Sequence, residues 1–470
     1  MPVAAIDQGT TSTRALVVDD AGESRIARVM EHRQRYPQPG WVEHDPEQLI
    51  GHIRQCIDAC GEVSALGIDN QGESCLAWDA HSGEAVSPVI TWQDNRTAQA
   101  IDRLRRDGAQ ELVSERAGVP LDSYFSASKL AWIAAQIPAA RALQRRGKLR
   151  LGTTDAFFVE RLTGHFVTDL TTASRTSLLN LQSGQWDPDL CDLFGVPVEA
   201  LPEIVPTTGD FGVIEQRGQS IPLTASVVDQ QASLYGHGCR APGDAKITFG
   251  TGAFALALSG TRPLRAPQQG LAPTAAWQLA GQAPVYALEG GVYCAGAAIN
   301  WARSLRLFQA FEQIGGFSRP SAIARDLVFV PALTGLACPH WDSRAGGLWL
   351  GLSLDTQAPD LMQSILEGIA FRAAEVVAAM HRVTPLADTL SIDGGVSANP
   401  YFCQFLANVL GRRVAVQPLA ELTALGTAQL AGAPPPPDKA PGKCYEPVED
   451  MAHHLERFAQ AVERSTRWLR

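Results

Sequence analysis

Two short segments rich in glycine and hydroxyl side chains are well suited to hold phosphate. Residues 9–12 read Gly-Thr-Thr-Ser, and residues 250–252 read Gly-Thr-Gly. Glycine lets a tight turn expose its backbone N–H groups, and Thr and Ser hydroxyls add further donors. Neither segment has the Gly-x-x-x-x-Gly-Lys-Ser/Thr pattern of a P-loop, so we expect phosphate binding by hairpin turns. Each segment alone could equally be an ordinary turn.

Two aspartates stand at the ends of apolar, strand-like runs. Asp7 follows residues 3–6, where a carboxylate can hold hydrated Mg²⁺ against nucleotide phosphates. Asp229 follows residues 225–228, where it could accept a hydroxyl proton during phosphoryl transfer. Both have structural alternatives, because Asp7 could hydrogen-bond its own turn and Asp229 could cap a helix that begins at residue 230.

A third motif, Asp393-Gly394-Gly395, follows a short apolar run and precedes a helix signal at Asn399. A strand, a double glycine and a helix N-terminus suit adenosine and its phosphates. The same residues could also form a strand-to-helix turn with no ligand.

The elements that must position these residues repeat along the chain. Residues 3–18 predict a strand, a polar turn and a second strand, and residues 246–258 repeat the pattern. Two similar hairpins, each opening one half of the chain, predict two domains of related plan. We expect residues 1–240 and 241–470, divided in a loop-like stretch near residues 236–243.

Helical periodicity is clearest in the second half. Apolar residues recur at helical spacing from 359 to 380, and a second helix is expected after Asn399, which can cap it, up to Gly411. A final helix with one apolar face is expected over residues 451–462, beyond an extended spacer at residues 434–437. Mixed strands and helices indicate an α/β architecture.

Composition excludes several classes of protein. The 470 residues suggest two to three domains, and 45% apolar with 19% charged residues is a globular balance. Lys and Arg number 39 against 49 Asp and Glu, a net charge of −10. We therefore expect no nucleic-acid partner.

The nine cysteines are scattered and never form Cys-x-x-Cys. They are expected to be reduced thiols that pack as small hydrophobic residues in a cytoplasmic protein. The N-terminus lacks a basic region, and no 18-residue apolar stretch occurs, so neither secretion nor membrane association is expected.

Nearly the whole chain resembles the FGGY family of carbohydrate kinases, and within it the glycerol kinases. The matching segments are residues 5–14, 36–46, 91–97, 124–132, 168–176, 229–231, 250–254 and 393–395. The resemblance implies two actin-like ATPase (ribonuclease H-like) domains flanking a catalytic cleft, with ATP and Mg²⁺ as cofactors. It also implies a polyol or sugar as substrate, phosphorylated at a terminal hydroxyl, and a homo-oligomer, dimer or tetramer.

The resemblance also implies roles for individual residues. Asp229 resembles the catalytic base, and Asp7 the second catalytic carboxylate, which helps to place Mg²⁺. The residues that resemble ATP-binding positions are Thr10, Thr11, Ser12, Arg14, Gly250, Thr251, Gly296, Asn300, Gly395 and Asn399. Those that resemble substrate-binding positions are Glu73, Trp92, Tyr124, Asp229, Gln230 and Phe254. Without the resemblance, the three aromatic residues would be read as core and Glu73 as a solvated surface charge.

The chain departs from the glycerol kinase pattern in four places, one of which is a C-terminal region shortened around residues 434–437. Gly72 stands where glycerol kinases have an arginine that clamps glycerol, so glycerol itself is in question, and a four- or five-carbon polyol or ketose becomes an alternative. Arg96 could replace the missing guanidinium. Asn300 replaces a Gln, which keeps an amide on a shorter side chain. Residues 215–220 lack the glycine-rich loop that binds fructose bisphosphate in regulated relatives, so that form of control is not expected.

Two other functions remain open on the same fold. An actin-like ATPase would share both phosphate hairpins and the adenosine motif but would have no use for Glu73, Trp92 and Gln230 together. A catalytically silent sugar sensor would be expected to have lost Asp7, Asp229 or Thr251, which are all present.

Overall fold

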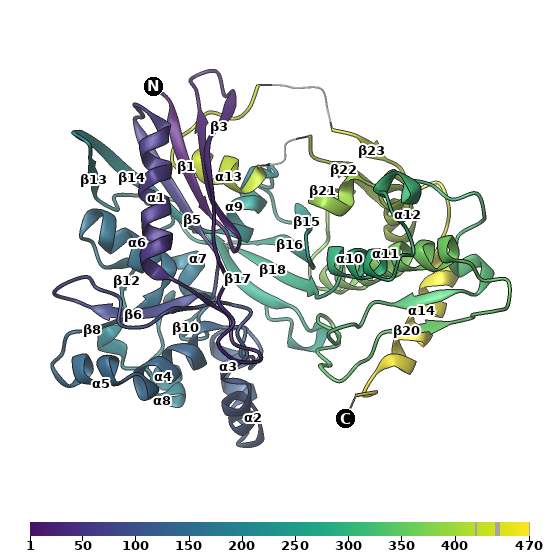
Figure 1. Ribbon diagram of the computed structural model, residues 1–470, viewed down its shortest axis with the longest axis horizontal. Coiled ribbons are helices and arrows are strands. Elements are labelled where there is room, and N and C mark those ends of the chain that lie inside the picture. The colour runs from purple at the N-terminus through teal and green to yellow at the C-terminus, as the bar shows by residue number, and fades with distance from the viewer. Residues whose placement is uncertain (419–420, 438–441, 470) are drawn as a thin grey trace.

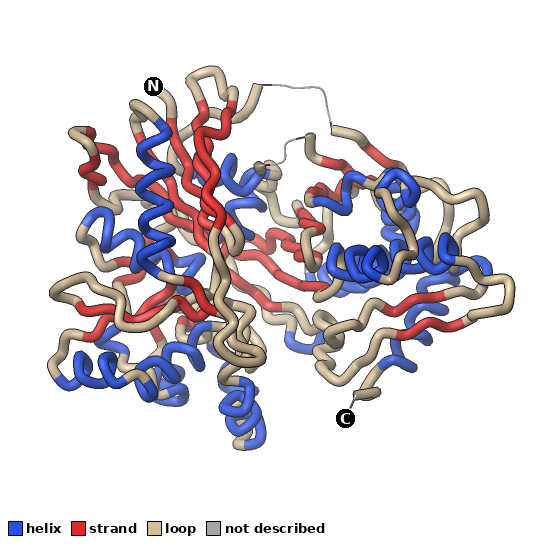
Figure 2. Tube along the Cα trace, in the orientation of Figure 1, coloured by secondary structure: helices blue, strands red, loops and turns tan. Residues whose placement is uncertain are grey.

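The computed structural model describes residues 1–418, 421–437 and 442–469, which form two lobes around two large sheets (Figures 1 and 2). The sheet of the first lobe has the order β13 (Val213–Gln216), β14 (Gln219–Val228), β5 (Ala65–Asn70), β1 (Val3–Gln8), β2 (Ser12–Val18), β3 (Ser24–Glu31). The sheet of the second lobe has the order β17 (Ala272–Trp277), β18 (Val285–Val292), β16 (Ala253–Gly260), β15 (Ala245–Phe249), β21 (Thr389–Asp393), β22 (Arg413–Val416), β23 (Cys444–Tyr445).

The two sheets share one strand plan. In the first, β1 pairs antiparallel with β2, β2 pairs antiparallel with β3, and β1 and β5 are parallel, as are β5 and β14. In the second, β15, β16, β18, β21 and β22 repeat these relations in the same order. The predicted α/β fold with two hairpins of related plan is therefore confirmed.

The central strand β1 is buried over its full length because helices cover both of its faces. Successive side chains of a strand point to opposite faces of the sheet. Ala4 and Ile6 pack in a cluster with α1 (Pro46–Cys60), whereas Val3 and Ala5 pack in a cluster with α13 (Leu422–Leu430). Helix α13 thus returns from the second half of the chain to the first lobe, where Figure 1 shows it beside β1.

Helix α13 crosses α9 (Asp229–Gly236) at very short range. A Cβ atom built on Gly426 of α13 would lie 1.9 Å from the carbonyl oxygen of Ala232, and one on Gly236 of α9 would lie 2.0 Å from that of Leu422. Only glycine lets the two backbones approach this closely. The chain leaves α9 at this crossing and continues to β15 of the second lobe.

The predicted helices of the second half are confirmed. They are α11 (Ala358–Val383), α12 (Pro400–Leu410) and α14 (Ala452–Ser465). Asn399 caps α12 by accepting a hydrogen bond from the backbone of Phe402, and Gly411 ends it in the left-handed conformation.

The other elements complete the lobes. The small strands are β4 (Glu43–His44), β6 (Cys75–Asp79), β7 (Val89–Ile90), β8 (Leu149–Thr153), β9 (Val167–Asp169), β10 (Leu179–Asn180), β11 (Gln185–Trp186), β12 (Glu203–Val205), β19 (Val328–Val330) and β20 (Leu348–Leu350). The remaining α-helices are α2 (Ala98–Arg106), α3 (Gln110–Arg116), α4 (Ser126–Gln136), α5 (Pro138–Arg145), α6 (Thr154–Thr163), α7 (Leu170–Ala173), α8 (Pro188–Phe194) and α10 (Gly296–Ser304).

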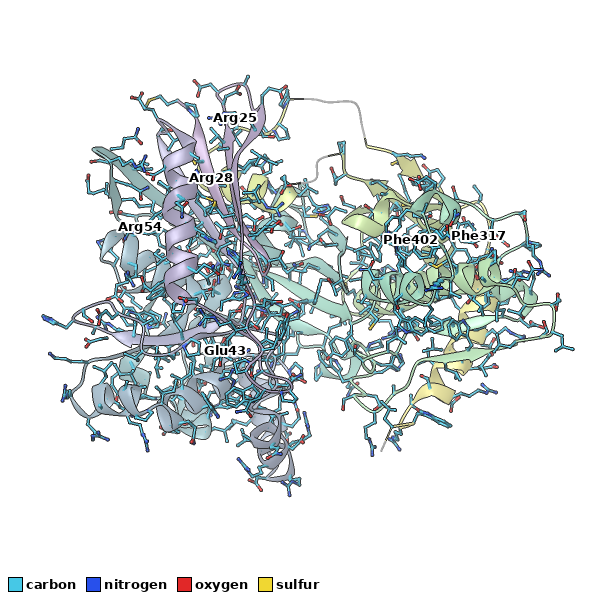
Figure 3. All side chains as sticks on the ribbon, viewed as in Figure 1. Arg25, Arg28, Glu43, Arg54, Phe317 and Phe402 are labelled. Atoms are coloured by element: carbon cyan, nitrogen blue, oxygen red, sulfur yellow. The ribbon has the colours of Figure 1, made fainter. Side chains whose placement is uncertain are left out.

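The side chains drawn in Figure 3 include both exposed and buried ones. The edge strand β3 is exposed along most of its length and carries Arg25 and Arg28, charges that discourage pairing with another chain. Phe402 packs inside the second lobe, with its ring 4.9 Å from that of Phe249. Among the described residues, no helix combines the length and apolar character needed to cross a membrane.

All nine cysteines are free thiols, as expected. Eight of them are buried, in agreement with their packing as small hydrophobic residues, and Cys444 is exposed.

Candidate active site

The first phosphate hairpin lies at the end of β1, and Asp7 is part of that strand. Its carboxylate lies 3.4 Å from Arg14 of β2, and Arg14 also pairs with Glu421 ahead of α13. Asp7 is level with Asp69 on the parallel strand β5. Burial raises the pKa of both carboxyls, that of Asp69 well above its usual range because Asp7 is also close. The charge of Arg14 acts against this rise at Asp7, which is the carboxylate of the pair that we expect to meet a cation.

Asp229 is the first residue of α9 and does not act as its cap. One carboxylate oxygen accepts the backbone N–H of Gln230 at 2.7 Å. Burial, with the negative charges of Glu73 and Asp7, raises the pKa of Asp229 to about 7. A carboxyl in this range can exchange a proton near neutral pH, as a general base must.

Glu73 lies between β5 and β6 in a conformation that L residues rarely adopt, with φ of 61°. It is 4% exposed and so is a buried charge, as its place in the motif implied. Arg175 donates to Glu73 at 2.6 Å and to Glu289 of β18 at 3.0 Å. The three charges form a buried bridge. The strained backbone of Glu73 is of a kind that is concentrated at functional sites.

The three predicted substrate-side aromatics are only partly buried. The rings of Trp92 and Tyr124 meet edge to face at 5.8 Å, and the guanidinium of Arg175 lies 5.8 Å from the Tyr124 ring. Phe254 of β16 approaches Gly291, whose added Cβ would lie 3.5 Å from its ring. The Trp92 indole N–H donates to Thr10 Oγ1 at 3.1 Å and so ties the predicted substrate side to the first phosphate hairpin.

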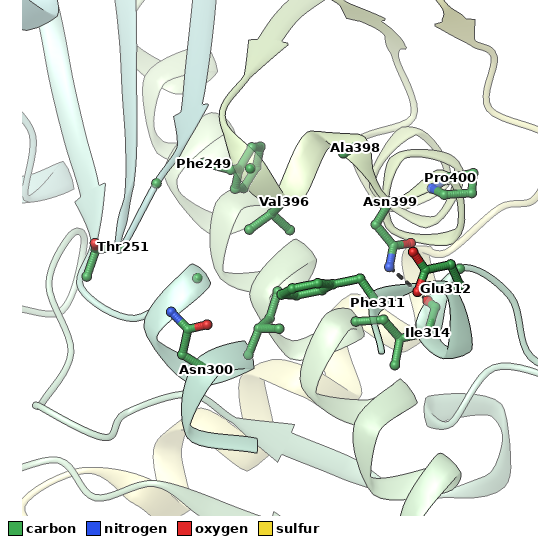
Figure 4. Close-up of a pocket in the computed structure, with 15 residues that line it drawn as sticks. Phe249, Thr251, Asn300, Phe311, Glu312, Ile314, Val396, Ala398, Asn399 and Pro400 are labelled. Carbon is green, nitrogen blue, oxygen red and sulfur yellow. Dashed lines mark hydrogen bonds between the residues drawn. The ribbon is translucent and has the colours of Figure 1, made fainter. Parts of the chain in front are cut away.

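A cavity of about 770 Å³ lies in the second lobe beside the second hairpin (Figure 4). Six residues predicted to contact ATP line it: Gly250, Thr251, Gly296, Asn300, Gly395 and Asn399. The first hairpin (Thr10, Thr11, Ser12, Arg14) belongs to the other lobe and is not part of this lining. Gly296 opens α10 and donates its N–H to Gly250 at 2.9 Å, and an added Cβ would lie 2.5 Å from that oxygen. The second hairpin and α10 are thereby held together.

Sequence reasoning missed part of this lining. Phe311, Glu312 and Ile314 come from a segment with no motif, and Figure 4 shows Phe311 lying between Asn300 and Asn399. Phe311 is 52% exposed and lines the cavity, features that only the structure shows, so no motif in the sequence singled it out. Asn399 also donates to the carbonyl of Ile314 at 2.8 Å.

Arg96, which could replace the arginine missing at position 72, is held by other groups. Its guanidinium pairs with Asp94 at 2.8 Å and Glu43 at 2.7 Å and lies 3.8 Å from the Trp41 ring, while its Nη1 atom has no hydrogen-bond partner among the described residues. Its role as a replacement therefore stays a prediction. A second buried guanidinium of this region belongs to Arg175, which sequence reasoning matched as part of a motif without a role.

Two models of one family together match most of the chain. The model described as the FGGY family of carbohydrate kinases, N-terminal domain, matches residues 3–236, and the C-terminal domain model matches residues 245–433. The chain belongs to the FGGY family of carbohydrate kinases. As an FGGY kinase it is an ATP-dependent enzyme that acts on a carbohydrate or polyol.

Relatives of this FGGY kinase are similar to it in sequence over nearly its whole length. Glycerol kinase of Alkalilimnicola ehrlichii is 41% identical over 443 residues, which cover 91% of this chain and 89% of the relative. Glycerol kinase 1 of Pseudomonas aeruginosa is 38% identical over 471 residues, covering 97% and 94%. The crystal structure of Plasmodium falciparum glycerol kinase with ADP superimposes with a TM-score of 0.89 at 27% identity, covering 99% of this chain and 98% of that one.

We expect Gly250→Val to weaken Mg-ATP binding to this FGGY kinase by at least about tenfold and to leave polyol binding unchanged. A Cβ at Gly250 would meet only the carbonyl oxygen of Gly252, at 3.9 Å, so the added bulk enters the cavity rather than the protein. Calorimetry with each ligand separately measures the effect. Gly51→Val is the matched control, since Gly51 has no neighbour within 4 Å of an added Cβ and lies in α1. Equal losses of both ligands in Gly250→Val would contradict the assignment.

Proposed function

We propose that this FGGY kinase transfers the γ-phosphoryl group of ATP to a terminal hydroxyl of a small polyol, with glycerol as the first candidate. The observation that carries the proposal is the Asp229 carboxyl, whose pKa is raised to about 7 within the field of both Glu73 and Asp7. The names of the relatives support glycerol.

The polyol is proposed to lie among the side chains of both lobes. Glu73 and Gln230 offer polar atoms for its hydroxyls, and Trp92, Tyr124 and Phe254 offer apolar walls for its carbon chain. Asp229 then takes the proton of the reacting hydroxyl as that oxygen attacks the γ-phosphorus. Holding acceptor, base and phosphate in line supplies most of the acceleration in such transfers.

ATP is proposed to bind across the cleft, with adenosine in the cavity at Gly395, Asn399 and Asn300. Its phosphates would meet the second hairpin at Gly250 and Thr251 with Gly296, and the first hairpin on the other side at Thr10, Thr11, Ser12 and Arg14. Closure of the two proposed domains, residues 1–240 and 241–470, would exclude water, which competes as phosphoryl acceptor.

Asp7 is the proposed carboxylate for Mg²⁺. In the described part of the chain, no group of three or more His, Cys, Asp or Glu side chains is placed to hold a metal ion alone. Mg²⁺ is often held by one or two carboxylates together with nucleotide phosphates, and Asp7 at the end of β1 fits that mode. The bound ion would neutralise charge on the phosphates during transfer.

Three broader expectations remain proposals. The free, mostly buried cysteines support action in the cytoplasm, and the net charge of −10 supports the absence of a nucleic-acid partner. A dimer or tetramer is proposed from the family alone and is measured by sedimentation.

The test is a panel of glycerol, erythritol, threitol, xylitol, ribitol, xylulose and dihydroxyacetone, assayed for ATP consumption and product mass. A kinase gives polyol-stimulated ATP consumption and a phosphorylated product. ATP hydrolysis that no member of the panel stimulates would favour an actin-like ATPase, and binding without turnover would favour a sensor.

Gly72 favours a second candidate, a four- or five-carbon polyol or ketose. A Cβ there would meet the Val228 side chain at 3.5 Å and Arg175 at 3.9 Å, ordinary contact distances, so the position tolerates a small side chain. Without the arginine, glycerol loses a charge-assisted donor, and a longer substrate could make contacts that glycerol does not.

We therefore expect a four- or five-carbon member of the panel to exceed glycerol in kcat/KM, and Gly72→Arg to shift the ranking toward glycerol by about tenfold or more. Gly72→Ala is the control, since it fills little space and adds no donor. If glycerol has the highest kcat/KM in the wild type and Gly72→Arg leaves the ranking unchanged, this second candidate is contradicted.

A further inference from the structure

Lys246 is a fully buried lysine in the middle of the molecule that neither the sequence motifs nor the proposed reaction uses. It lies on β15, the strand that leads into the second phosphate hairpin. Its ammonium nitrogen Nζ donates to Gln230 Oε1 at 2.7 Å and to Thr248 Oγ1 at 2.9 Å. Gln230 belongs to α9 of the first lobe, so this hydrogen bond joins the two lobes at the proposed polyol site.

The chemistry of lysine fixes which way the Gln230 carboxamide points. An ammonium group has three donors and no acceptor, so only the carbonyl oxygen of Gln230 can face it. The amino group, Nε2, must then point the other way. It has no hydrogen-bond partner within residues 1–418, 421–437 and 442–469, and Gln230 is only partly buried.

The charge of Lys246 is balanced by carboxylates rather than by solvent. Burial lowers its pKa, and the charges of Asp393, Asp229 and Glu289 act in the opposite direction. A buried charge is costly to maintain, and a buried ion pair is by itself weak evidence of a stabilising role. An orienting role accounts better for a lysine that meets a substrate-side residue.

We propose that Lys246 is a positioning residue that fixes the Gln230 carboxamide with its amino group toward the polyol. The inference rests on the proposed function, because it takes Gln230 to contact the substrate. The substrate atom beside Gln230 must then be a hydrogen-bond acceptor, which a hydroxyl or a carbonyl oxygen supplies and an alkyl group does not.

A double-mutant cycle with Lys246→Met and Gln230→Ala tests the proposal. Each single variant is expected to raise the KM for glycerol by about tenfold, with the KM for ATP changed less than about twofold. If Lys246 acts through Gln230, the double variant is no worse than the worse single one. Independent, multiplying effects would overturn the proposal, as would an unchanged KM in folded Lys246→Met.

Three variants control for folding and charge. Thr248→Val removes the other hydrogen bond of Lys246 and is expected to leave the KM for glycerol unchanged. Lys246→Arg keeps a cation with donors only and is expected to recover most of the glycerol binding. If Lys246→Met does not fold, Lys246→Gln replaces it, since its carboxamide can accept as well as donate and no longer fixes Gln230. An unchanged KM in that variant overturns the proposal.

Glycerol binding measured by calorimetry gives the same comparison without turnover. A wild type that binds glycerol but phosphorylates no member of the panel would defeat the proposed function and still decide the role of Lys246. A wild type that phosphorylates glycerol while the cycle is additive would defeat the role of Lys246 alone.

Discussion

Asp229→Asn is expected to lower kcat by about 10²-fold or more, the usual range for loss of a general base, while Mg-ATP binding survives. The amide fills the same volume and can still accept the backbone N–H of Gln230, which the carboxylate meets at 2.7 Å, so the start of α9 is kept. Only the ability to take a proton is lost. Steady-state kinetics with the preferred polyol and calorimetry with Mg-ATP measure the two parts.

The wild-type pH profile gives an independent check. Because the base must be ionised and its pKa is raised to about 7, kcat/KM falls as the pH drops through that value. Asp229→Asn should lose this limb of the profile. A near wild-type kcat in the variant, or an unchanged acid limb, would remove Asp229 from the role of base.

Arg175→Met is expected to lower the free energy of unfolding by about 3–5 kcal/mol and kcat/KM for the polyol by about 10²-fold or more. Arg175 is 2% exposed and pairs with Glu73 and Glu289, which are 4% and 7% exposed. Without the guanidinium, two buried carboxylates lose their shared partner, and Glu73 loses the contact that holds it beside the proposed polyol site. Denaturant unfolding and steady-state kinetics measure the two effects.

Two further variants serve as controls for this interpretation. Arg265→Met removes an ion pair with Glu115 at 3.5 Å in which both side chains are about 60% exposed, and it should change stability little. Arg175→Lys keeps one charge but cannot bridge both carboxylates with a planar fork, so it should fall between wild type and Arg175→Met. Equal stability of Arg175→Met and wild type would show that the bridge is not needed for folding.

Local pattern was enough to predict the hairpins and several helices. Residues 3–18 and 246–258 alternate between apolar strands and polar turns, and each forms its expected antiparallel pair. The helix after Asn399 was predictable because its start and end are set by side chains within the helix and its caps. In these cases all the information lies within a few residues of the element.

Contacts between distant segments could not be predicted in this way. The bridge of Glu73, Arg175 and Glu289 joins three segments more than 100 residues apart. Its partners can be identified only in the folded structure. Lys246 looked like an ordinary strand residue, because nothing around it in sequence points to Gln230. The return of α13 to the first lobe was hidden for the same reason.

The glycine crossing of α9 and α13 is where the chain leaves the first lobe after α9 for β15 of the second. We therefore expect this crossing to act as the fulcrum of any opening of the lobes. Asp229 is the first residue of α9 and lies seven residues before Gly236, about 10 Å away at 1.5 Å per residue, so it is close to this fulcrum. The cavity beside the second hairpin is lined by residues of the second lobe, so we expect a rotation about the crossing to carry the cavity with that lobe while Asp229 stays with the first. A bulkier residue at Gly426 would clash with the carbonyl oxygen of Ala232 and push α9 and α13 apart, and we expect it to disturb closure without touching either ligand.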